Sequence, residues 1–277
     1  MPVALLDGDS WVYRCGFAAE KTYYLVEEPD GTYRKFQTHK EAKDYYDPQH
    51  SYIWSRKEIE PLENCLQMVK TSLENTLNVL GTSQRKIYLS GRRSFRDDVF
   101  SDYKGNRDGM AKPKYYRDIR DYLVGAWGAV VVDGIEADDA LGIEAGSNKD
   151  CVIVAVDKDL DQIPGDHYNW TKGERYVVTQ KGGLRFFYEQ LLSGDPTDNV
   201  PGIPGIGPVK AKKALEECKT PNECALTVER MYREYLEQGA GVADTNPREI
   251  IDRNATLLWI QREKDQKHPF WKHYETK

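Results

Sequence analysis

Apolar residues along the chain fall into short runs and into helical periods that alternate with each other. Short apolar runs predict strands at residues 3–7, 86–89, 129–133 and 151–156, with a shorter pair near residue 168 and at 176–178. Apolar positions with a helical spacing predict helices at residues 61–80 and 115–125 and a helix that starts at residue 137. Because strands and helices alternate, the pattern predicts an α/β fold with a central, mostly parallel sheet flanked by helices.

Two parts of the chain depart from this alternation. Residues 20–60 are rich in tyrosine and charged residues and contain turn signals, which predicts an inserted hairpin or an extended excursion. After about residue 190 the strand signal fades, and helices are predicted at 209–218, 222–238 and 247–261. We therefore predict an α/β domain over residues 1–190 and a helical part over residues 191–277.

The composition limits the class of protein. With 277 residues the chain is long enough to bury a core, and no apolar run approaches the length of a membrane span. The first residues, MPVALLDGDS, lack the charged start and long apolar segment of a signal peptide, so we expect a cytoplasmic protein. The five cysteines are scattered without a CxxC pair, which argues against disulfides and against a zinc site.

The net charge of −6 conceals a separation of charges along the chain. Four short acidic clusters contain nine candidate acids, and without these nine the balance is −6 + 9 = +3. Between residues 84 and 121 there are eleven Lys or Arg against six Asp, a local excess of +5. This separation is typical of a protein that holds metal ions in one place and phosphates in another.

The four acidic clusters, LLDGD, GIEADD, VDKDLD and GDPTDN, lie where a strand is predicted to end or a helix to begin. Each has an ordinary explanation, because aspartate is frequent in turns and at helix N-termini. However, parallel strands bring their carboxyl ends to one edge of a sheet, and carboxylates that meet there repel one another without divalent cations between them. The clusters therefore predict metal-dependent phosphate chemistry. The candidate residues are Asp7, Asp9, Glu136, Asp138, Asp139, Asp157, Asp159, Asp195 and Asp198.

A glycine-rich turn follows the last acidic cluster, within residues 195–215. It reads PGIPGIG, and a helix start with several lysines comes directly after it. Closely spaced glycines let backbone N–H groups approach phosphate oxygens, and the N-terminus of a helix adds its positive dipole end. A plain turn between two helices is the alternative, but it does not need this combination. The segment predicts a helix-hairpin-helix element that holds the backbone of duplex DNA, with Gly202, Gly205, Gly207, Lys210 and Lys212 as candidates.

A basic stretch within residues 90–114 and just beyond mixes cations with aromatic residues. Arg96, Tyr103, Lys104 and Arg107 are its candidates for binding DNA. Cations that grip phosphates and aromatic faces that stack on bases are the combination that single-stranded channels use. A solvated, charged loop is the alternative interpretation, and the motif YKGNR at residues 103–107 weighs against it.

The order of these motifs resembles that of the structure-specific 5′ nucleases, the family of the flap endonucleases and of the 5′→3′ exonuclease domains of bacterial DNA polymerases. The motifs are DGDS, YKGNR, EADD, DKDL and GDPTDNVPGIPGIG, in this order. In its small size the chain is similar to the bacteriophage 5′→3′ exonucleases. The resemblance implies a PIN-like nuclease core, an arch-like basic segment at 90–114 and a helix-three-turn-helix clamp for DNA.

The resemblance also implies a role for each candidate. Metal ligands fall into a first group, Asp7, Glu136, Asp138 and Asp139, and a second group, Asp157, Asp159, Asp195 and Asp198. Lys104 and Arg107 match residues that contact the scissile phosphate, and Tyr103 matches an aromatic near the unpaired base. Ser90 stands where the family usually has an aspartate, so the first metal site is expected to be the weaker, with Asp9 or water as a substitute ligand.

The implied activity is hydrolysis of DNA phosphodiester bonds from 5′ ends by a two-metal mechanism with Mg²⁺ or Mn²⁺. The resemblance also implies a K⁺ ion at the clamp and removal of RNA from hybrids. It further implies a monomer that has no membrane partner and acts in phage DNA replication, recombination or host DNA degradation.

Two other functions compete with this one. Haloacid-dehalogenase-type phosphatases also begin with a strand followed by DxD, which would make Asp7 a nucleophile and Asp9 a general acid, but EADD and YKGNR would stay unexplained. A non-catalytic module that binds duplex DNA would not need the first three acidic clusters.

Overall fold

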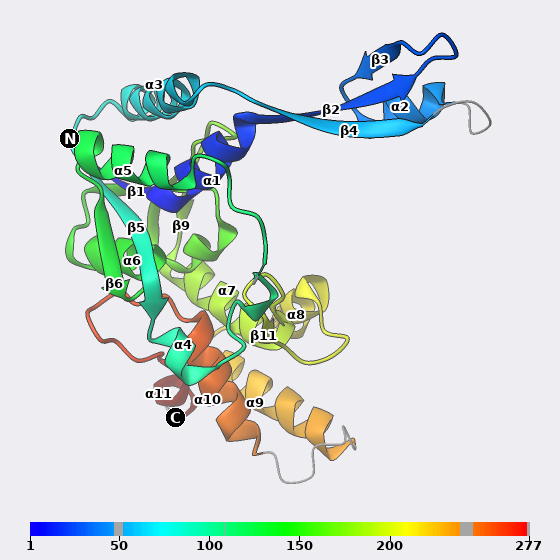
Figure 1. Ribbon diagram of the computed structural model, residues 1–277. Coiled ribbons are helices and arrows are strands. Elements are labelled where there is room, and N and C mark those ends of the chain that lie inside the picture. Colours follow the sequence, from blue (N-terminus) through cyan, green and yellow to red (C-terminus); the bar gives the residue numbers. More distant parts are fainter. Residues whose placement is uncertain (47–51, 108, 239–245, 276–277) are drawn as a thin grey trace. The chain divides into compact units, whose positions relative to one another are not determined.

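The computed structural model describes residues 1–46, 52–107, 109–238 and 246–275, which belong to two compact units (Figure 1). Unit 1 contains Met1–Ser10, Leu77–Met110 and Trp127–Lys277, and unit 2 contains Trp11–Thr76 and Ala111–Ala126. These units divide the chain at other places than residue 190, so the predicted boundary between an α/β domain and a helical part stays a prediction.

Unit 1 is built on a six-stranded sheet with the strand order β6-β5-β1-β7-β8-β9. All neighbouring strands in it are parallel except β8 and β9, which are antiparallel. This confirms the predicted fold class. The strands are β1 (Val3–Asp7), β5 (Arg85–Ser94), β6 (Val130–Gly134), β7 (Cys151–Val154), β8 (Gly165–Asn169) and β9 (Glu174–Val178).

The carboxyl ends of the central strands determine where the acidic clusters lie. Strand β1 is fully buried from Ala4 to Leu6 and ends at Asp7. It pairs with β5 on one side and β7 on the other, so the segments that follow these strands leave the sheet at the same edge. Helix α6 (Ala137–Ser147) packs against the sheet through Leu141 and Ala145, and its N-terminus carries the EADD cluster.

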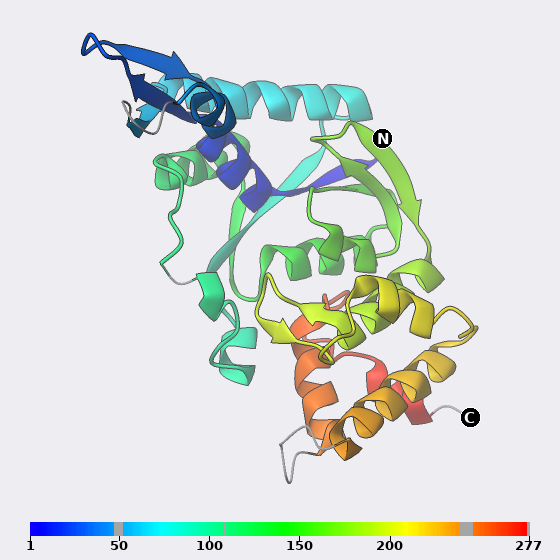
Figure 2. The same cartoon turned by 90° about the vertical axis from the view of Figure 1, so that its right-hand side faces the viewer.

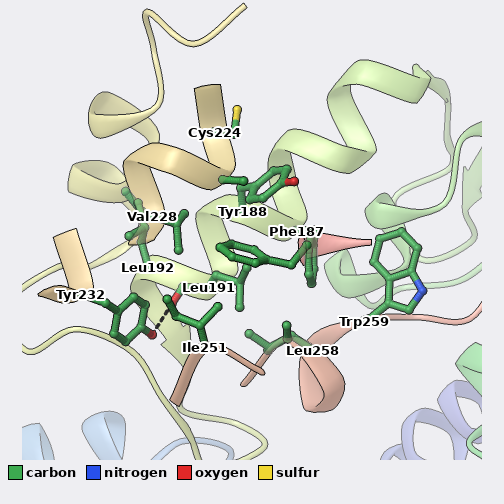
Figure 3. Close-up of a cluster of buried hydrophobic side chains, with 14 of the residues drawn as sticks. Phe187, Tyr188, Leu191, Leu192, Cys224, Val228, Tyr232, Ile251, Leu258 and Trp259 are labelled. Atoms are coloured by element: carbon green, nitrogen blue, oxygen red, sulfur yellow. Dashed lines mark hydrogen bonds between the residues drawn. The ribbon is translucent and has the colours of Figure 1, made fainter. Parts of the chain in front are cut away.

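Short helices and the helical C-terminal segment complete unit 1. They are α4 (Arg96–Val99), η1 (Gly105–Arg107), η2 (Lys158–Gln162), α7 (Gln180–Ser193), α8 (Pro208–Ala214), α9 (Pro221–Glu237), α10 (Pro247–Leu258) and α11 (Phe270–Glu275), with the two-residue strands β10 (Gly194–Asp195) and β11 (Val200–Pro201) (Figure 2). Figure 3 shows side chains from α7, α9 and α10 that meet in one hydrophobic cluster. In it the Tyr232 hydroxyl donates a hydrogen bond of 2.7 Å to the Leu191 carbonyl, so the buried phenol is satisfied.

Helix α7 was not predicted from the sequence. Gly182 and Gly183 stand in its first turn, where glycine disfavours a helix. Thr179 caps the helix by accepting a hydrogen bond from the Gly182 N–H. A Cβ at Gly183 would lie 2.2 Å from the Gln162 carbonyl oxygen, so close packing requires glycine there and outweighs its low helix propensity. Among the described residues, no helix is both long enough and apolar enough to cross a membrane.

Unit 2 contains most of α1 (Gly8–Ala18), α2 (His39–Tyr45), α3 (Leu62–Leu80) as far as Thr76, and α5 (Tyr116–Trp127) as far as Ala126. The segment predicted as an excursion contains the antiparallel sheet β3-β2-β4, formed by β2 (Glu20–Glu27), β3 (Tyr33–Phe36) and β4 (Ile53–Ile59). The helices are joined by polar contacts in the interior, such as the 2.8 Å hydrogen bond from the Trp11 indole to the Ser72 hydroxyl.

Candidate active site

Carboxylates from both predicted metal groups line one small cavity of unit 1. The cavity has a volume of about 30 Å³, which is room for a water molecule or an ion. Its acidic side chains come from the N-terminus of α6, from η2 and from the turn between β10 and β11. They are Glu136, Asp138, Asp159, Asp195 and Asp198.

The first group is crowded with negative charge. Burial, and then repulsion by Asp9 and Asp157, raise the pKa of the Asp7 carboxyl to about 7. The pKa of Asp138 also lies well above its usual value, because of burial and the charges of Asp7, Asp157 and Glu136. Asp138 therefore faces carboxylates of both groups, which joins the two groups electrostatically.

The second group is held by hydrogen bonds. The Gln190 amide on α7 donates a 2.8 Å hydrogen bond to Asp159 Oδ1, and Lys158 Nζ lies 2.7 Å from the same oxygen. Burial and the charge of Asp157 raise the pKa of Asp159 to about 7. Burial also acts to raise the pKa of Asp195, but hydrogen bonds from Asp159 and from the Thr197 N–H outweigh it and keep this pKa below its usual value. Asp195 is therefore the more acidic member of this pair.

Asp139 and Arg96 do not occupy their predicted places. Asp139 is fully buried, and its Oδ1 and Oδ2 lie 2.9 and 2.5 Å from two nitrogens of the Arg96 guanidinium. The same carboxylate accepts hydrogen bonds from the backbone N–H groups of Gln261 and Glu136. Because both oxygens are engaged, this arrangement does not present Asp139 as a metal ligand. Arg96 is only 2% exposed and also donates to the Leu257 carbonyl, so it does not face a DNA strand.

The YKGNR segment brings two cations to the cavity. Lys104 has a left-handed backbone with φ of 56°, and its N–H donates a 2.9 Å hydrogen bond to the Asp198 carbonyl. Its Nζ lies 2.6 Å from Glu136 Oε1 and 3.6 Å from Asp198 Oδ2. Arg107 forms an ion pair with the Asp198 carboxylate. The structure therefore brings both predicted phosphate-binding side chains together with the acids.

The predicted stacking role of Tyr103 does not fit its position. The Tyr103 ring is only 6% exposed and belongs to the hydrophobic cluster of α7 to α10. Its hydroxyl lies 3.0 Å from Asp198 Oδ2 and 3.3 Å from Glu136 Oε2, and burial raises its pKa. In this conformation Tyr103 positions two carboxylates and offers no face to a base.

Ser90, at the position of the expected aspartate, makes two structural contacts. Its N–H donates a 2.8 Å hydrogen bond to Asp9 Oδ2, and its hydroxyl accepts one of 3.0 Å from the Ala137 N–H at the start of α6. Ser90 thereby caps the helix and holds the Asp9 carboxylate, whose charge acts on Asp7. The suggestion that Asp9 substitutes for the missing ligand stays a prediction.

The three glycines of the turn between β11 and α8 occupy their positions for different structural reasons. A Cβ at Gly202 would lie 2.3 Å from the Gly194 nitrogen, so packing requires glycine. Gly205 has φ of +78°, a left-handed conformation, and Lys210 Nζ donates a 2.8 Å hydrogen bond to its carbonyl. Gly207 caps α8, and open space surrounds its Cα. Gly207 at the start of α8 and Lys212 within this helix are both exposed.

Sequence reasoning missed the residues that support the second group. Gln190 and Gln162 are buried, and the Gln162 amide donates a 2.7 Å hydrogen bond to Gln190 Oε1. This pair connects Asp159 to the chain near Leu258. Gln190 lies on the helix that was not predicted, so the sequence carried no signal for it. Lys158 is the second residue of the DKDL motif, so the sequence does carry a signal for this supporting residue.

The carboxylates of both groups are chemically suited to a divalent cation, although their spacing in this structure does not form a complete metal site. Among the described residues, no three His, Cys, Asp or Glu side chains are close enough to ligate one ion in this arrangement. The carboxylates are hard oxygen donors of the kind that Mg²⁺ and Mn²⁺ prefer. Burial, and then the charges of neighbouring carboxylates, raise the pKa values of Asp7, Asp138 and Asp159.

This excess charge predicts a pH-dependent effect of metal on stability. Asp7 and Asp159 keep their protons up to about pH 7 in the folded protein, whereas their usual pKa is 3.8. The folded state thus binds more protons than the unfolded chain, so metal-free stability falls as pH rises from about 4 through 7. We expect Mg²⁺ to raise Tm more at pH 8 than at pH 5, in thermal melts with EDTA as the control. An equal rise at both pH values would contradict the crowding of these carboxylates.

Comparison with known proteins identifies sequence relatives, although no model of a protein family matches the chain. A 5′-3′ exonuclease of Buchnera aphidicola is 27% identical over 226 residues, which cover 74% of this chain and 67% of the relative. DNA polymerase I of Rhizobium leguminosarum is 29% identical over 167 residues, 54% of this chain. The flap endonuclease Xni of a Shewanella species is 27% identical over 175 residues, 57% of this chain and 67% of the relative. The chain spans only 16% of the polymerase.

A solved structure shares the fold. The bacteriophage T5 flap endonuclease, in a complex with DNA and metal ions, superposes with a TM-score of 0.61 at 14% sequence identity. The match covers 94% of this chain and 89% of that protein. It confirms the predicted fold for nearly the whole chain, and the sequence relatives confirm the predicted resemblance.

Proposed function

Because this chain is a homologue of 5′-3′ exonucleases, flap endonucleases and a segment of DNA polymerase I, we propose that it is a metal-dependent 5′ nuclease that hydrolyses DNA. One observation carries the proposal. Carboxylates from three separate acidic clusters line a single cavity, and the cations of the YKGNR segment contact two of these carboxylates.

Two divalent ions, Mg²⁺ or Mn²⁺, are the proposed cofactors. Asp7, Glu136 and Asp138 would hold one, with Asp9 as a further donor, and the second group, Asp157, Asp159, Asp195 and Asp198, would hold the other. When bound, such ions activate the attacking water and stabilise the leaving oxygen of the phosphodiester. Asp139 supports the site through Arg96 and lies outside the ligand set.

The remaining residues act on the substrate. Lys104 and Arg107 neutralise carboxylates in this structure, and we expect them to turn to the scissile phosphate once cations take over that role. Charge neutralisation keeps Lys104 protonated, because Glu136 and Asp198 outweigh the effect of its burial and raise its pKa. Tyr103 keeps Glu136 and Asp198 in place by its hydroxyl.

The turn with Gly202, Gly205 and Gly207 is the proposed clamp for the duplex. Gly205, Gly207, Lys210 and Lys212 are exposed, so phosphate oxygens can approach the turn, and such backbone contacts read no sequence. A K⁺ ion at this turn belongs to the proposal. So do action on flaps and on RNA in hybrids, a monomeric state, a cytoplasmic location and a role in phage DNA metabolism.

Three labelled substrates test this function: a duplex with a 5′-labelled flap, an RNA–DNA hybrid with a 5′ label, and a closed circular duplex with an internal label. We expect release of short 5′-phosphorylated products from the first, only with Mg²⁺ or Mn²⁺, and none from the circle, because the reaction starts at a 5′ end. Binding without cleavage would favour the DNA-binding module. Phosphate release from a small ester without DNA cleavage would favour the phosphatase.

A further inference from the structure

The sheet β3-β2-β4 of unit 2 has one face that α2 covers. Val26 and Ala42 are buried between them, and the Tyr24 and His39 rings lie 5.2 Å apart. Phe36 of β3 lies 5.2 Å from Tyr45 of α2. Residues directly opposite on neighbouring strands share a face of the sheet, and successive residues alternate between faces. The other face therefore carries the alternate positions of all three strands.

That second face is rich in aromatic side chains that are open to solvent. Trp54 is 50% exposed and Tyr33 is 53% exposed, although large aromatic side chains are normally well buried. Leu25 on the central strand is paired with Trp54 on β4, and with Lys35 on β3. Tyr23 is paired with Arg56, one step further along the sheet. Trp54 and Tyr23 are thus diagonal neighbours, about 7–8 Å apart.

Cations surround these rings. Lys35 Nζ lies 3.9 Å from the centroid of the Tyr23 ring, and the Arg56 side chain is exposed. On this face itself the three cations Lys21, Lys35 and Arg56 stand against the two acids Glu27 and Glu58, a balance of 3 − 2 = +1, whereas the whole chain has −6. The face is therefore locally positive on an acidic protein, which favours an anionic partner and disfavours a second copy of the chain.

We propose that this open face, with Tyr23, Tyr33 and Trp54 as stacking surfaces and Lys35 and Arg56 as phosphate contacts, binds an unpaired nucleic acid strand. Aromatic faces accept any base, and cations between them follow the backbone, so such a surface binds strands without reading their sequence. Unpaired bases of a single strand are free to stack on aromatic rings, whereas the bases inside a duplex already stack on one another. The choice of nucleic acid as the polymer rests on the proposed function.

Binding in EDTA tests this inference without any cleavage. The probe is a fluorescein-labelled single-stranded oligo(dT), with oligo(rU) and a blunt duplex of the same length in parallel arms, measured by fluorescence anisotropy. We expect Trp54→Ala and Trp54→Leu to weaken binding of the single strand about tenfold, and Trp54→Phe to retain most of it, because only the phenyl ring keeps a stacking face. Binding of the blunt duplex should stay unchanged.

A second readout identifies the contact itself. Single strands should quench part of the tryptophan emission of the wild type, and Trp54→Phe should lose that change while it still binds. Arg56→Gln should lower the slope of log affinity against log salt by about 0.7, the contribution of one phosphate contact on a single strand. Equal affinities of all Trp54 variants, or a dimer that Trp54→Ala disrupts in sedimentation experiments, would overturn the inference. Cleavage of the 5′ flap by the same preparations in Mg²⁺ shows separately whether the proposed function holds.

Discussion

Replacing Asp159 with asparagine should lower the rate of metal-dependent DNA hydrolysis by about three orders of magnitude. Asp159 lines the cavity together with acids of both groups, and burial and the charge of Asp157 raise the pKa of its carboxyl. The substitution keeps the size of the side chain and removes one negative charge from the proposed ligand set. Loss of several kcal/mol of transition-state stabilisation corresponds to a rate effect of this size. Single-turnover cleavage of a 5′-labelled flap at saturating Mg²⁺ measures it.

Asp161→Asn is the matched control, because it makes the same chemical change two residues further along η2. Asp161 accepts a hydrogen bond from the Tyr176 hydroxyl and is not among the side chains that line the cavity. We expect this variant to cleave at a rate close to that of the wild type. Similar rates for Asp159→Asn and Asp161→Asn would place the chemistry elsewhere.

Replacing Arg96 with leucine should destabilise the fold by about 3–5 kcal/mol, because it leaves the buried Asp139 carboxylate without its partner. Urea unfolding followed by circular dichroism measures the change. Arg175→Leu is the control, since the Arg175–Asp166 pair is exposed and removal of such a pair costs at most about 1 kcal/mol.

The double variant Arg96→Leu with Asp139→Leu tests whether Asp139 acts as the partner of Arg96 in a buried ion pair. If Arg96 and Asp139 form a buried ion pair, removal of both charges should recover part of the stability that Arg96→Leu alone loses. If Asp139 were instead a metal ligand, Asp139→Asn would weaken Mg²⁺ binding and leave the free energy of unfolding in EDTA unchanged. A stable Asp139→Asn protein with impaired metal binding would contradict the structural assignment.

Features that depend on neighbouring residues were predicted well from the sequence. The apolar run before Asp7 and the acids at the start of α6 mark the strand end and the helix start by local pattern alone. Parallel pairing then brings the strand ends to one edge, so the cavity follows from the order of the elements.

Features that depend on distant residues were not predicted. The motif EADD places three acids in four residues, but only Arg96, more than 40 residues earlier, determines that Asp139 turns inward. Tyr103 stands in a polar, basic stretch, and helices from the C-terminal part of unit 1 bury its ring. The glycines of α7 likewise disfavour a helix, and only the close approach of the Gln162 backbone explains why glycine stands at Gly183.

The central claim is that the carboxylates around this cavity cut DNA from a 5′ end with divalent metal. Its most direct measurement is the time course of label release from a 5′-labelled flap, for the wild type beside Asp159→Asn, with Mg²⁺ and with EDTA. We expect rapid release by the wild type in Mg²⁺ alone, and release slowed about a thousandfold by the variant. Release in EDTA, or release by Asp159→Asn at the rate of the wild type, would contradict it.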